Sequence, residues 1–256
     1  MKTLDESIAA AMTGESQNVA IIPFLPYILQ DFWELGTPPH ILIDFVQRHC
    51  KNYSMLHVLD LGCGKGAVSV KLAEAFQCSC YGIDGISEFI ESAKEKSREY
   101  GVETLCRFEA SDIRERIDAL DTFDIIVLGA IGPVFGNYYR TLTRLLQHLT
   151  PEGIILVNDA YIDDSSTFQY HGVLPHQELL HQIKEAGMEV IDEYTGKPTN
   201  SAEEFESLQK RCKELMLKYP EQTVLFENYL QMQAAEYEAL EHKITGIIMV
   251  LKKACH

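Results

Sequence analysis

A glycine-rich stretch, "VLDLGCGKGAVSV" at residues 58–70, holds the residues whose types and spacing are best suited to binding a ligand. Gly62, Gly64 and Ala67 satisfy the pattern G-x-G-x-x-G/A, whose glycines let the backbone approach a ligand at the start of a helix. The phosphate-loop pattern G-x-x-x-x-G-K-[ST] is not satisfied, because neither Ser nor Thr follows Lys65. The stretch therefore predicts a ligand-binding loop between a strand and a helix.

The acidic residues around this loop distinguish between its possible ligands. Asp60 precedes Gly62, and a carboxylate there would repel a pyrophosphate, which binds where the helix dipole favours negative charge. The same carboxylate would attract a ligand that carries an ammonium and a sulfonium group. Asp84 lies 20 residues after Gly64, where it could bind ribose hydroxyls. These charges favour S-adenosylmethionine, with a nicotinamide dinucleotide as the alternative.

Regular alternation of short apolar strands and amphipathic helices positions these residues. The spacing predicts an α/β fold, a seven-stranded, mostly parallel sheet with helices on both faces. The stretch at 123–130 is so apolar that it should be a central strand. We expect strands at 56–62, 78–84, 104–111, 123–130, 188–195 and 244–253, and helices at 67–76, 87–101, 135–149 and 175–187. The stretch 149–162 is expected to form a Pro-x-Gly turn and then the fifth strand.

Two segments lie outside this alternation. Residues 1–55 precede the first strand and consist of predicted helices interrupted by prolines, and residues 201–243 separate the last two strands. We expect a core of residues 56–200 and 244–256, an N-terminal helical cap segment of residues 1–55, and a helical insertion at 201–243 that contributes to the cap.

Five motifs in order resemble those of the class I S-adenosylmethionine-dependent methyltransferases. "VLDLGCGKG" is similar to their first motif, "YGID" to the second, and "EASDI" to the segment after the third strand. "FDIIVLGAI" and "LLQHLTPEGIILVND" are similar to the fourth-strand motif and to the turn before the fifth strand. The subgroup that the chain resembles most is that of ubiquinone/menaquinone-biosynthesis-like small-molecule methyltransferases. This resemblance implies a Rossmann-like methyltransferase fold with an antiparallel last strand.

The resemblance also implies a set of cofactor-binding residues. Asp60 and the glycine loop would hold the methionine end, Asp84 the ribose, and Asp112 the adenine amino group. Asp84 and Asp112 are also suited to cap the turns that follow them. The full implied set is Asp60, Gly62, Cys63, Gly64, Gly66, Asp84, Gly85, Ser111, Asp112, Ile113 and Gly129.

Residues for the acceptor and for proton transfer are less defined by the sequence. Tyr27, Trp33 and Tyr138 are candidates for the acceptor pocket, and ordinary packing would explain each of them equally well. Asp159 and Tyr161 follow the fifth strand and are candidates for a general base. We expect no metal site, because the histidines show no ligand spacing and an acid is absent after the fourth strand.

Composition limits the class of partner. The formal net charge of −16 makes a nucleic-acid substrate unexpected, and the longest apolar stretch is too short and too rich in proline to span a bilayer. The seven cysteines form no paired C-x-x-C framework, which is typical of a reduced, cytoplasmic protein. We expect a monomeric or homodimeric enzyme that methylates an unidentified small molecule. An NAD-dependent oxidoreductase and a non-catalytic adenosylmethionine-binding protein are the alternatives.

Overall fold

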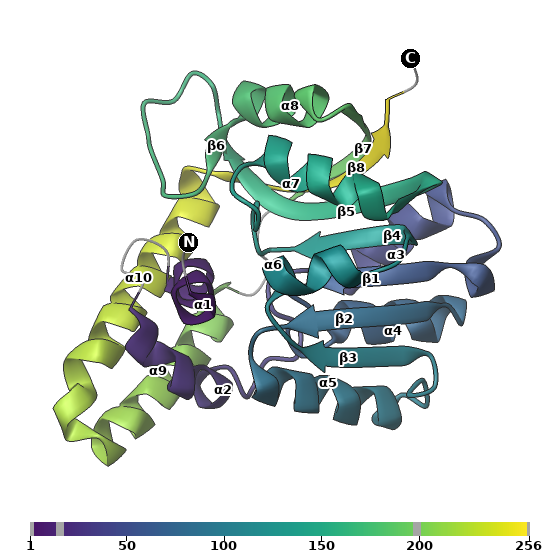
Figure 1. The fold of residues 1–256 in the computed structure, drawn as a ribbon. Coiled ribbons are helices and arrows are strands. Elements are labelled where there is room, and N and C mark those ends of the chain that lie inside the picture. Colours follow the sequence, from purple (N-terminus) through teal and green to yellow (C-terminus); the bar gives the residue numbers. More distant parts are fainter. Residues whose placement is uncertain (1–2, 14–17, 197–200, 255–256) are drawn as a thin grey trace. The chain divides into compact units, whose positions relative to one another are not determined.

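A computed structural model describes residues 3–13, 18–196 and 201–254. It contains one mixed sheet whose strand order is β3-β2-β1-β4-β5-β8-β7, with helices around it (Figure 1). The strands are β1 (His57–Leu61), β2 (Ser79–Asp84), β3 (Cys106–Ala110), β4 (Phe123–Gly129), β5 (Leu149–Ile162), β6 (Leu174–Pro175), β7 (Met188–Gly196) and β8 (Thr245–Lys253). The expected α/β sheet, mostly parallel with antiparallel last strands, is confirmed. The sequence missed β6, a two-residue strand that pairs with β5.

The helices of the α/β core fall close to their expected positions. They are α3 (Pro39–His49), α4 (Ala67–Phe76), α5 (Ser87–Glu99), α6 (Ile113–Arg116), α7 (Tyr138–Leu145) and α8 (His176–Glu185). Short 3-10 turns lie at η3 (Tyr53–Met55), η4 (Ile117–Ala119) and η5 (Leu146–His148). The α-helix in the segment expected at 135–149 is therefore shorter, because α7 begins at Tyr138, directly after the capping residue Asn137, and tightens into η5.

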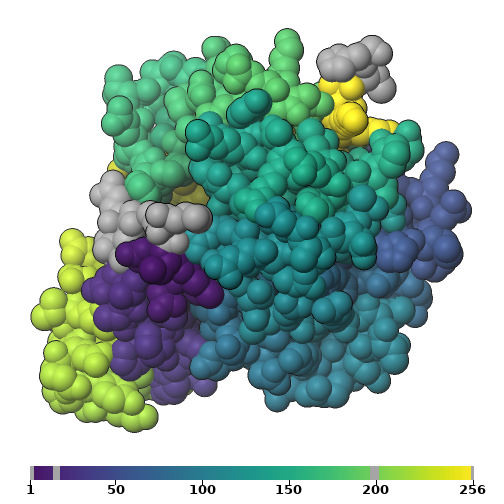
Figure 2. Space-filling model, in the orientation of Figure 1, coloured from purple at the N-terminus to yellow at the C-terminus, as the bar shows by residue number. Residues whose placement is uncertain are grey.

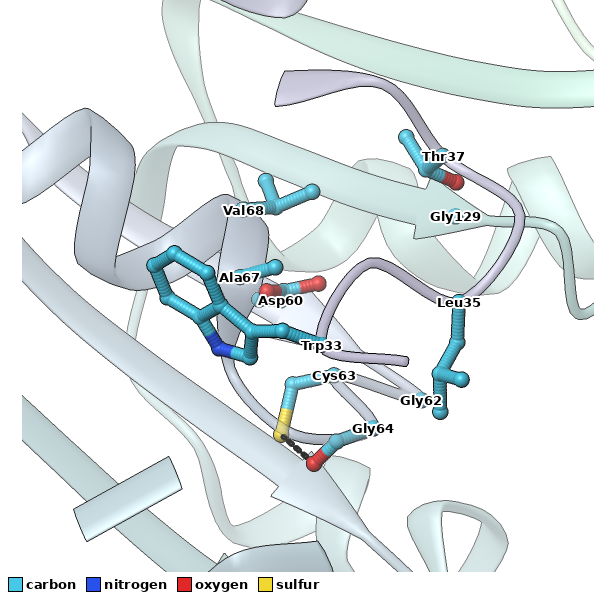
Figure 3. A pocket seen from close by; sticks show the side chains of 10 residues that line it. All are labelled: Trp33, Leu35, Thr37, Asp60, Gly62, Cys63, Gly64, Ala67, Val68 and Gly129. Carbon is cyan, nitrogen blue, oxygen red and sulfur yellow. Dashed lines mark hydrogen bonds between the residues drawn. The ribbon is translucent and has the colours of Figure 1, made fainter. Parts of the chain in front are cut away.

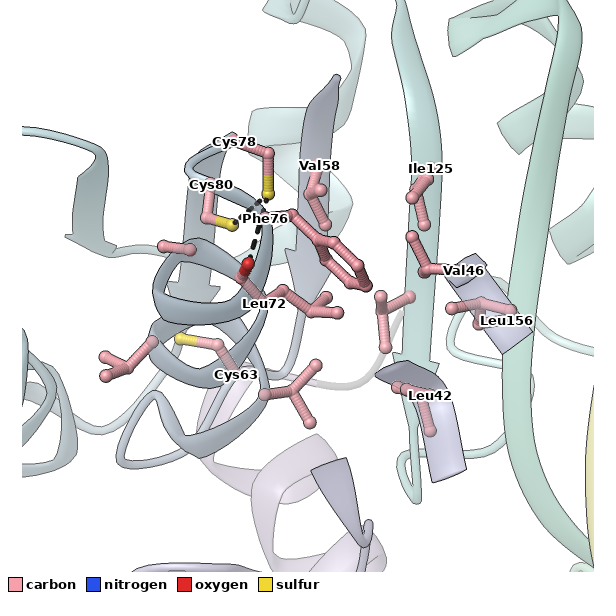
Figure 4. Packing of buried hydrophobic residues seen from close by; sticks show 14 of the residues in the cluster. Leu42, Val46, Val58, Cys63, Leu72, Phe76, Cys78, Cys80, Ile125 and Leu156 are labelled. Atoms are coloured by element: carbon pink, nitrogen blue, oxygen red, sulfur yellow. Dashed lines mark hydrogen bonds between the residues drawn. The ribbon is translucent and has the colours of Figure 1, made fainter. Parts of the chain in front are cut away.

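The central strands are buried on both faces, as their continuous apolar sequence requires. Alternate residues of β4, Ile125 and Val127, belong to a core cluster with residues from α3, α4 and α5 (Figure 4). The intervening residues Ile126 and Leu128 are equally buried and face the other side of the sheet. Figure 2 shows teal atoms, which belong to the middle of the sequence, exposed on one face of the core unit.

The expected Pro-x-Gly turn lies inside a strand. Pro151 and Gly153 belong to β5, and the pairing with β4 shifts there from Phe123↔Leu149 to Ile125↔Ile154. The extra residues of β5 form an irregularity in the ladder, because a bulge absorbs residues without ending the strand.

The chain divides into two compact units. Of the described residues, unit 2 contains 33–159, 175–195 and 247–254, and unit 1 contains 3–13, 18–32, 160–174, 196 and 201–246. The first boundary between the units lies after Phe32. The expected cap segment of residues 1–55 stays a prediction. Residues 33–55 join the core unit because the apolar face of α3, including Leu42 and Phe45, packs into the sheet's core cluster.

Unit 1 is helical. Its elements are α1 (Leu4–Thr13), η2 (Val19–Phe24), α2 (Leu25–Ile28), α9 (Ser201–Lys218), η6 (Pro220–Gln222) and α10 (Thr223–His242). Phe24 makes edge-to-face contacts with Tyr219 and Phe226, at ring-centroid distances of 5.4 and 5.0 Å. The N-terminal helices and the insertion therefore share one hydrophobic core within unit 1.

Candidate functional site

The glycine loop connects β1 to α4 in a backbone conformation that favours glycine. Gly62, Gly64 and Gly66 have φ angles of +70°, +52° and +75°. A Cβ on Gly62 would lie 2.4 Å from Ile131, so the loop also requires glycine for space. The N–H groups of Gly62 and Cys63 both donate to the carbonyl of Ile83, at 2.8 and 3.1 Å, which ties the loop to β2.

Asp60 is a buried carboxylate beside this loop. Its exposed fraction is 2%, and its Oδ2 accepts a hydrogen bond of 2.6 Å from the hydroxyl of Ser69. Burial raises the pKa of Asp60 to about 6, the Ser69 hydrogen bond lowers this pKa, and the charge of Asp84 raises it. Asp60 is consequently ionised near neutral pH and gives the loop a negative charge.

Asp84 links the end of β2 to the glycine loop. Its Oδ2 accepts the N–H of Gly64 and its Oδ1 accepts the N–H of Ile86, both at 2.9 Å. Burial raises the pKa of Asp84, and hydrogen bonds from the backbone oppose that rise. Each carboxylate oxygen keeps acceptor capacity beyond one N–H, so ribose hydroxyls fit this position.

The structure places the segment after β3 beside Asp84. The N–H of Ser111 donates to the carbonyl of Asp84 at 2.9 Å. Asp112 caps α6 by accepting the N–H of Arg114 at 2.8 Å, and its carboxylate also pairs with the Arg114 guanidinium at 2.6 Å. That guanidinium lowers the pKa of Asp112. The capping role considered from the sequence is therefore present, and Ile113 begins the capped helix.

The sheet order brings the remaining implied residues to the same edge, since β3, β2, β1 and β4 are adjacent and parallel. Gly85 follows β2 directly, and Gly129 ends β4 opposite Asn158 of β5. Cys63 is buried in the loop, and its Sγ would lie 2.9 Å from a Cβ built on Gly82. The space between the loop and β2 therefore accommodates only a small side chain at residue 63.

A cavity lies directly against the loop (Figure 3). Its volume is about 30 Å³, and its walls include Asp60, Gly62, Cys63, Gly64 and Gly129 from the implied cofactor set. Three further walls, Trp33, Leu35 and Thr37, come from the segment before α3. Of these the sequence suggested only Trp33, and it suggested that residue for the acceptor. Local patterns could not indicate Leu35 or Thr37, because both reach the loop only through tertiary folding.

The residues predicted for the acceptor lie in different parts of the chain. Tyr27 belongs to unit 1, where its hydroxyl donates to Glu214 Oε2 at 2.6 Å. Trp33 lines the cavity described above. Tyr138 begins α7, is buried, and donates from its hydroxyl to Asp159 Oδ2. The structure therefore brings Tyr138 and Asp159 together within unit 2. The acceptor role of Tyr27, Trp33 and Tyr138 stays a prediction.

The two candidates for a general base lie near the end of β5. Asp159 accepts the hydrogen bond from Tyr138, whose backbone N–H is fixed by Gln182 Oε1 at 2.9 Å. Burial and the Asp159 charge raise the pKa of Tyr138, so that hydroxyl remains protonated at neutral pH. Tyr161 lies two residues further along β5 and is partly buried.

The described residues contain no group of three or more His, Cys, Asp and Glu side chains that could hold a metal ion. Their helices include none with the length and hydropathy to cross a membrane. The six cysteines that the structure describes are free thiols.

Comparison with known proteins agrees with this geometry. The family model of the methyltransferase domain matches residues 52–216. The ubiquinone biosynthesis O-methyltransferase of Rickettsia canadensis is 24% identical over 168 residues, which cover 58% of this chain and 69% of that protein. The malonyl-[acyl-carrier protein] O-methyltransferase of Bacillus cereus is 28% identical over 118 residues, 46% of this chain and 42% of that protein. The match thus spans less than half the length of the second relative.

A solved structure shows the same fold over nearly the whole chain. The methyltransferase of Geobacter sulfurreducens, solved with S-adenosyl-L-homocysteine, has a TM-score of 0.75 and 18% identity, and the match covers 90% of this chain and 98% of that one. The family model covers more than half of the chain and includes the glycine loop, Asp84 and the strands that carry them. The chain therefore belongs to the methyltransferase domain family and is a class I S-adenosylmethionine-dependent methyltransferase.

Proposed function

We propose that this protein methylates a small molecule and that its glycine loop, Asp60 and Asp84 hold the methyl donor. The observation that carries the proposal is the carboxylate of Asp60, which is buried in the wall of the cavity beside the glycine loop. A buried negative charge at this position suits the ammonium of an amino-acid group and opposes a pyrophosphate. Asp84 would accept the ribose hydroxyls, with Gly85 and Ser111–Ile113 nearby for the adenine.

The residues of the chain contribute binding and orientation. When bound, S-adenosylmethionine supplies a methyl group that its sulfonium already activates. Holding two reactants in line can supply about 7–11 kcal/mol of a barrier, so alignment is the protein's main contribution. Backbone hydrogen bonds from the loop to Ile83 and Asp84 fix the loop before the ligand arrives. This preorganisation lowers the ordering cost of binding.

Asp159 is proposed as the general base where the acceptor retains its proton. Its carboxylate is oriented by the Tyr138 hydroxyl, and Tyr138 is held through its N–H by Gln182. A base needs this kind of fixed orientation to reach an acceptor proton. Tyr161, further along the same strand, is the second candidate.

The names of the relatives guide the choice of acceptors to test. Both relatives described above are O-methyltransferases, which favours an oxygen nucleophile here. A mass-spectrometric screen would offer phenols, quinols and carboxylic acids first, followed by amines and thiols. We expect S-adenosylmethionine-dependent addition of one methyl group to an oxygen acceptor.

Calorimetry separates this proposal from the two alternatives. We expect binding of S-adenosyl-L-homocysteine and none of NAD. Binding of NAD without binding of S-adenosyl-L-homocysteine would contradict the donor assignment. Binding of S-adenosyl-L-homocysteine without methylation of any acceptor in the panel would instead support a non-catalytic adenosylmethionine-binding protein.

A further inference from the structure

The cavity beside the glycine loop is lined by one carboxylate and by one hydroxyl group from a different segment of the chain. Asp60 supplies the carboxylate, and Thr37 supplies a hydroxyl from the segment before α3. Thr37 is buried, with an exposed fraction of 4%. The ten residues that line the cavity in the described part of the chain include no Lys, Arg or His. An amino-acid group bound here would therefore have a partner for its ammonium and no cation for its carboxylate.

Asn158 occupies the Thr37 hydroxyl as a hydrogen-bond acceptor and leaves its O–H free to act as a donor. The Nδ2 of Asn158 donates to Thr37 Oγ1 at 2.9 Å and to the carbonyl of Gly36 at 3.1 Å. The Thr37 oxygen is thus an acceptor, and its own O–H is still available as a donor. Among the hydrogen bonds of the described residues, this O–H donates to no protein acceptor. A buried donor without an acceptor is unfavourable unless a ligand supplies one.

Gly129 gives the Thr37 hydroxyl its place at the end of β4. A Cβ on Gly129 would lie 2.9 Å from Thr37 Oγ1, closer than real Cβ contacts allow. Any side chain at residue 129 would therefore displace the hydroxyl. The lack of a side chain at Gly129 leaves room for the Thr37 oxygen, and the hydrogen bond from Asn158 holds this oxygen at the cavity wall.

We propose that Thr37 binds the carboxylate of the methyl donor's methionine end, and that Asn158 is the positioning residue that directs its hydroxyl. Asp60 would hold the ammonium of the same amino-acid group. This inference rests on the proposed donor site and adds a residue that lies outside the matched domain, which begins at residue 52. A hydroxyl can fill this role because a hydrogen bond to a charged acceptor is about twice as strong as a neutral one.

Comparing two ligands measures the contribution of the donor's carboxylate to binding. S-adenosyl-L-homocysteine has the complete amino-acid group, and its decarboxylated analogue, 5′-deoxy-5′-(3-aminopropylthio)adenosine, keeps the ammonium only. Calorimetry would give both dissociation constants for the wild type, Thr37→Val and Thr37→Ser. Thr37→Val keeps the branched shape and removes the hydroxyl, whereas Thr37→Ser keeps the hydroxyl.

We expect Thr37→Val to weaken S-adenosyl-L-homocysteine about tenfold or more, the effect of losing a hydrogen bond to a charged group. The affinity of the decarboxylated analogue should stay within about twofold, and Thr37→Ser should restore most of the lost affinity. Equal weakening of both ligands, or unchanged affinity for S-adenosyl-L-homocysteine, would overturn the proposal.

The ratio of the two dissociation constants distinguishes loss of the carboxylate contact from misfolding, because a misfolded site would bind both ligands poorly. Asn158→Ala provides a second variant that leaves Thr37 in the chain. It should weaken S-adenosyl-L-homocysteine selectively, and equal loss of both ligands in this variant would count against the positioning role. A wild-type protein that bound neither ligand would instead contradict the donor site itself.

Discussion

Asp60 is the residue whose environment makes the clearest prediction about pH. Its pKa of about 6 means that the carboxylate loses its charge as the pH falls through that value. Because the ammonium of S-adenosyl-L-homocysteine remains charged, we expect its affinity to fall about tenfold from pH 7 to pH 5 by proton linkage. Calorimetry at several pH values would measure this dependence.

Two controls assign that pH dependence to Asp60. In Asp60→Asn the affinity should be low and independent of pH. The ligand 5′-methylthioadenosine shares the ribose and lacks the amino-acid group, so it reports on Asp84 without Asp60. The same pH dependence for 5′-methylthioadenosine would show that the titrating group is not Asp60.

Asp84 should contribute at least an order of magnitude to donor affinity. Asp84→Ala removes the carboxylate that accepts the Gly64 and Ile86 N–H groups and is proposed to bind the ribose. We expect S-adenosyl-L-homocysteine to bind about tenfold or more weakly, consistent with lost hydrogen bonds to a charged group. Unchanged affinity, measured by calorimetry, would refute the ribose role. Glu88→Ala, on the helix that follows, is a control that removes an acid outside the loop contacts.

The sequence could place these acids because each lies a fixed distance from a strand end. Asp60 and Asp84 belong to motifs that are continuous in the chain, so spacing alone indicates their common edge. Thr37 and Asn158 are 121 residues apart, and only the folded sheet shows that they form a hydrogen bond. Trp33 was assigned to the acceptor for the same reason, because its neighbours in space were not visible from local sequence.

At the scale of elements, the connection between β1 and α4 requires glycine where neighbouring side chains leave no room for a Cβ. A Cβ on Gly66 would lie 2.7 Å from Ala93 and 3.0 Å from Phe108, whereas a Cβ on Gly101 would meet nothing within 4 Å. Both glycines have positive φ, +75° and +66°, so alanine is strained at both. We expect Gly66→Ala to destabilise the protein by about 1–3 kcal/mol more than Gly101→Ala, the usual cost of overpacking.

Denaturant unfolding of the two glycine variants would measure this difference. Both variants carry the same kind of backbone strain, so the difference between their free energies of unfolding reports the overpacking beside Gly66, where α4, α5 and β3 meet. Equal destabilisation of both variants would show that the space beside Gly66 is not limiting.

We expect the segment Trp33–Thr37 to change its position when the donor binds. With this segment in place, the cavity beside the glycine loop has a volume of about 30 Å³, which is little room for an amino-acid group. Leu35 is the side chain that approaches Gly64, with its Cδ1 3.1 Å from a Cβ built there. The end at Thr37 is held by Asn158, so we expect Leu35 to move about Gly36, whose φ is +82°.

Trp33 provides an optical signal for this movement because it is the single tryptophan of the chain. Its indole N–H donates to the Lys65 carbonyl at 2.9 Å, and its ring stacks on Tyr100 with a centroid distance of 5.0 Å. Stopped-flow fluorescence should show a change on binding of S-adenosyl-L-homocysteine. Leu35→Ala should speed association severalfold, because less apolar contact holds the segment closed.

Met55→Ala is the matched control for that experiment, since Met55 is 71% exposed and does not line the cavity. It should leave the association rate unchanged. An association rate that is the same for Leu35→Ala and the wild type would show that Leu35 does not limit entry of the donor.

At the scale of the whole molecule, the sequence predicted the α/β core better than the grouping of its helices. The period of apolar residues determines strands and helices locally, and most expected elements were found within a few residues. Which helices share a core depends on contacts between distant segments. The described parts of residues 3–32 and 201–246 belong to one unit, and α3 belongs to the other.

Unit 1 is built from segments that are far apart in the sequence, so we expect substitution of Phe226, which joins two of them, to lower its stability. Its exposed fraction is 0%, it contacts Phe24 from the N-terminal segment, and it lies two residues from Val224, which is 66% exposed on the same helix. Removing a buried aromatic ring costs about 3–5 kcal/mol, whereas substitutions at exposed sites usually change stability by less than about 0.5 kcal/mol. Phe226→Ala should therefore destabilise unit 1, and Val224→Ala should not.

Hydrogen exchange would locate the effect within the molecule. In Phe226→Ala we expect faster exchange of amides in both α10 and the N-terminal segment Val19–Ile28, because Phe24 and Phe226 belong to the same core. If exchange accelerated in α10 alone, the N-terminal segment would not depend on the insertion for its stability. The same measurement on Val224→Ala should match the wild type, and this difference would establish that the N-terminal segment and α10, which are far apart in the sequence, form one cooperative unit.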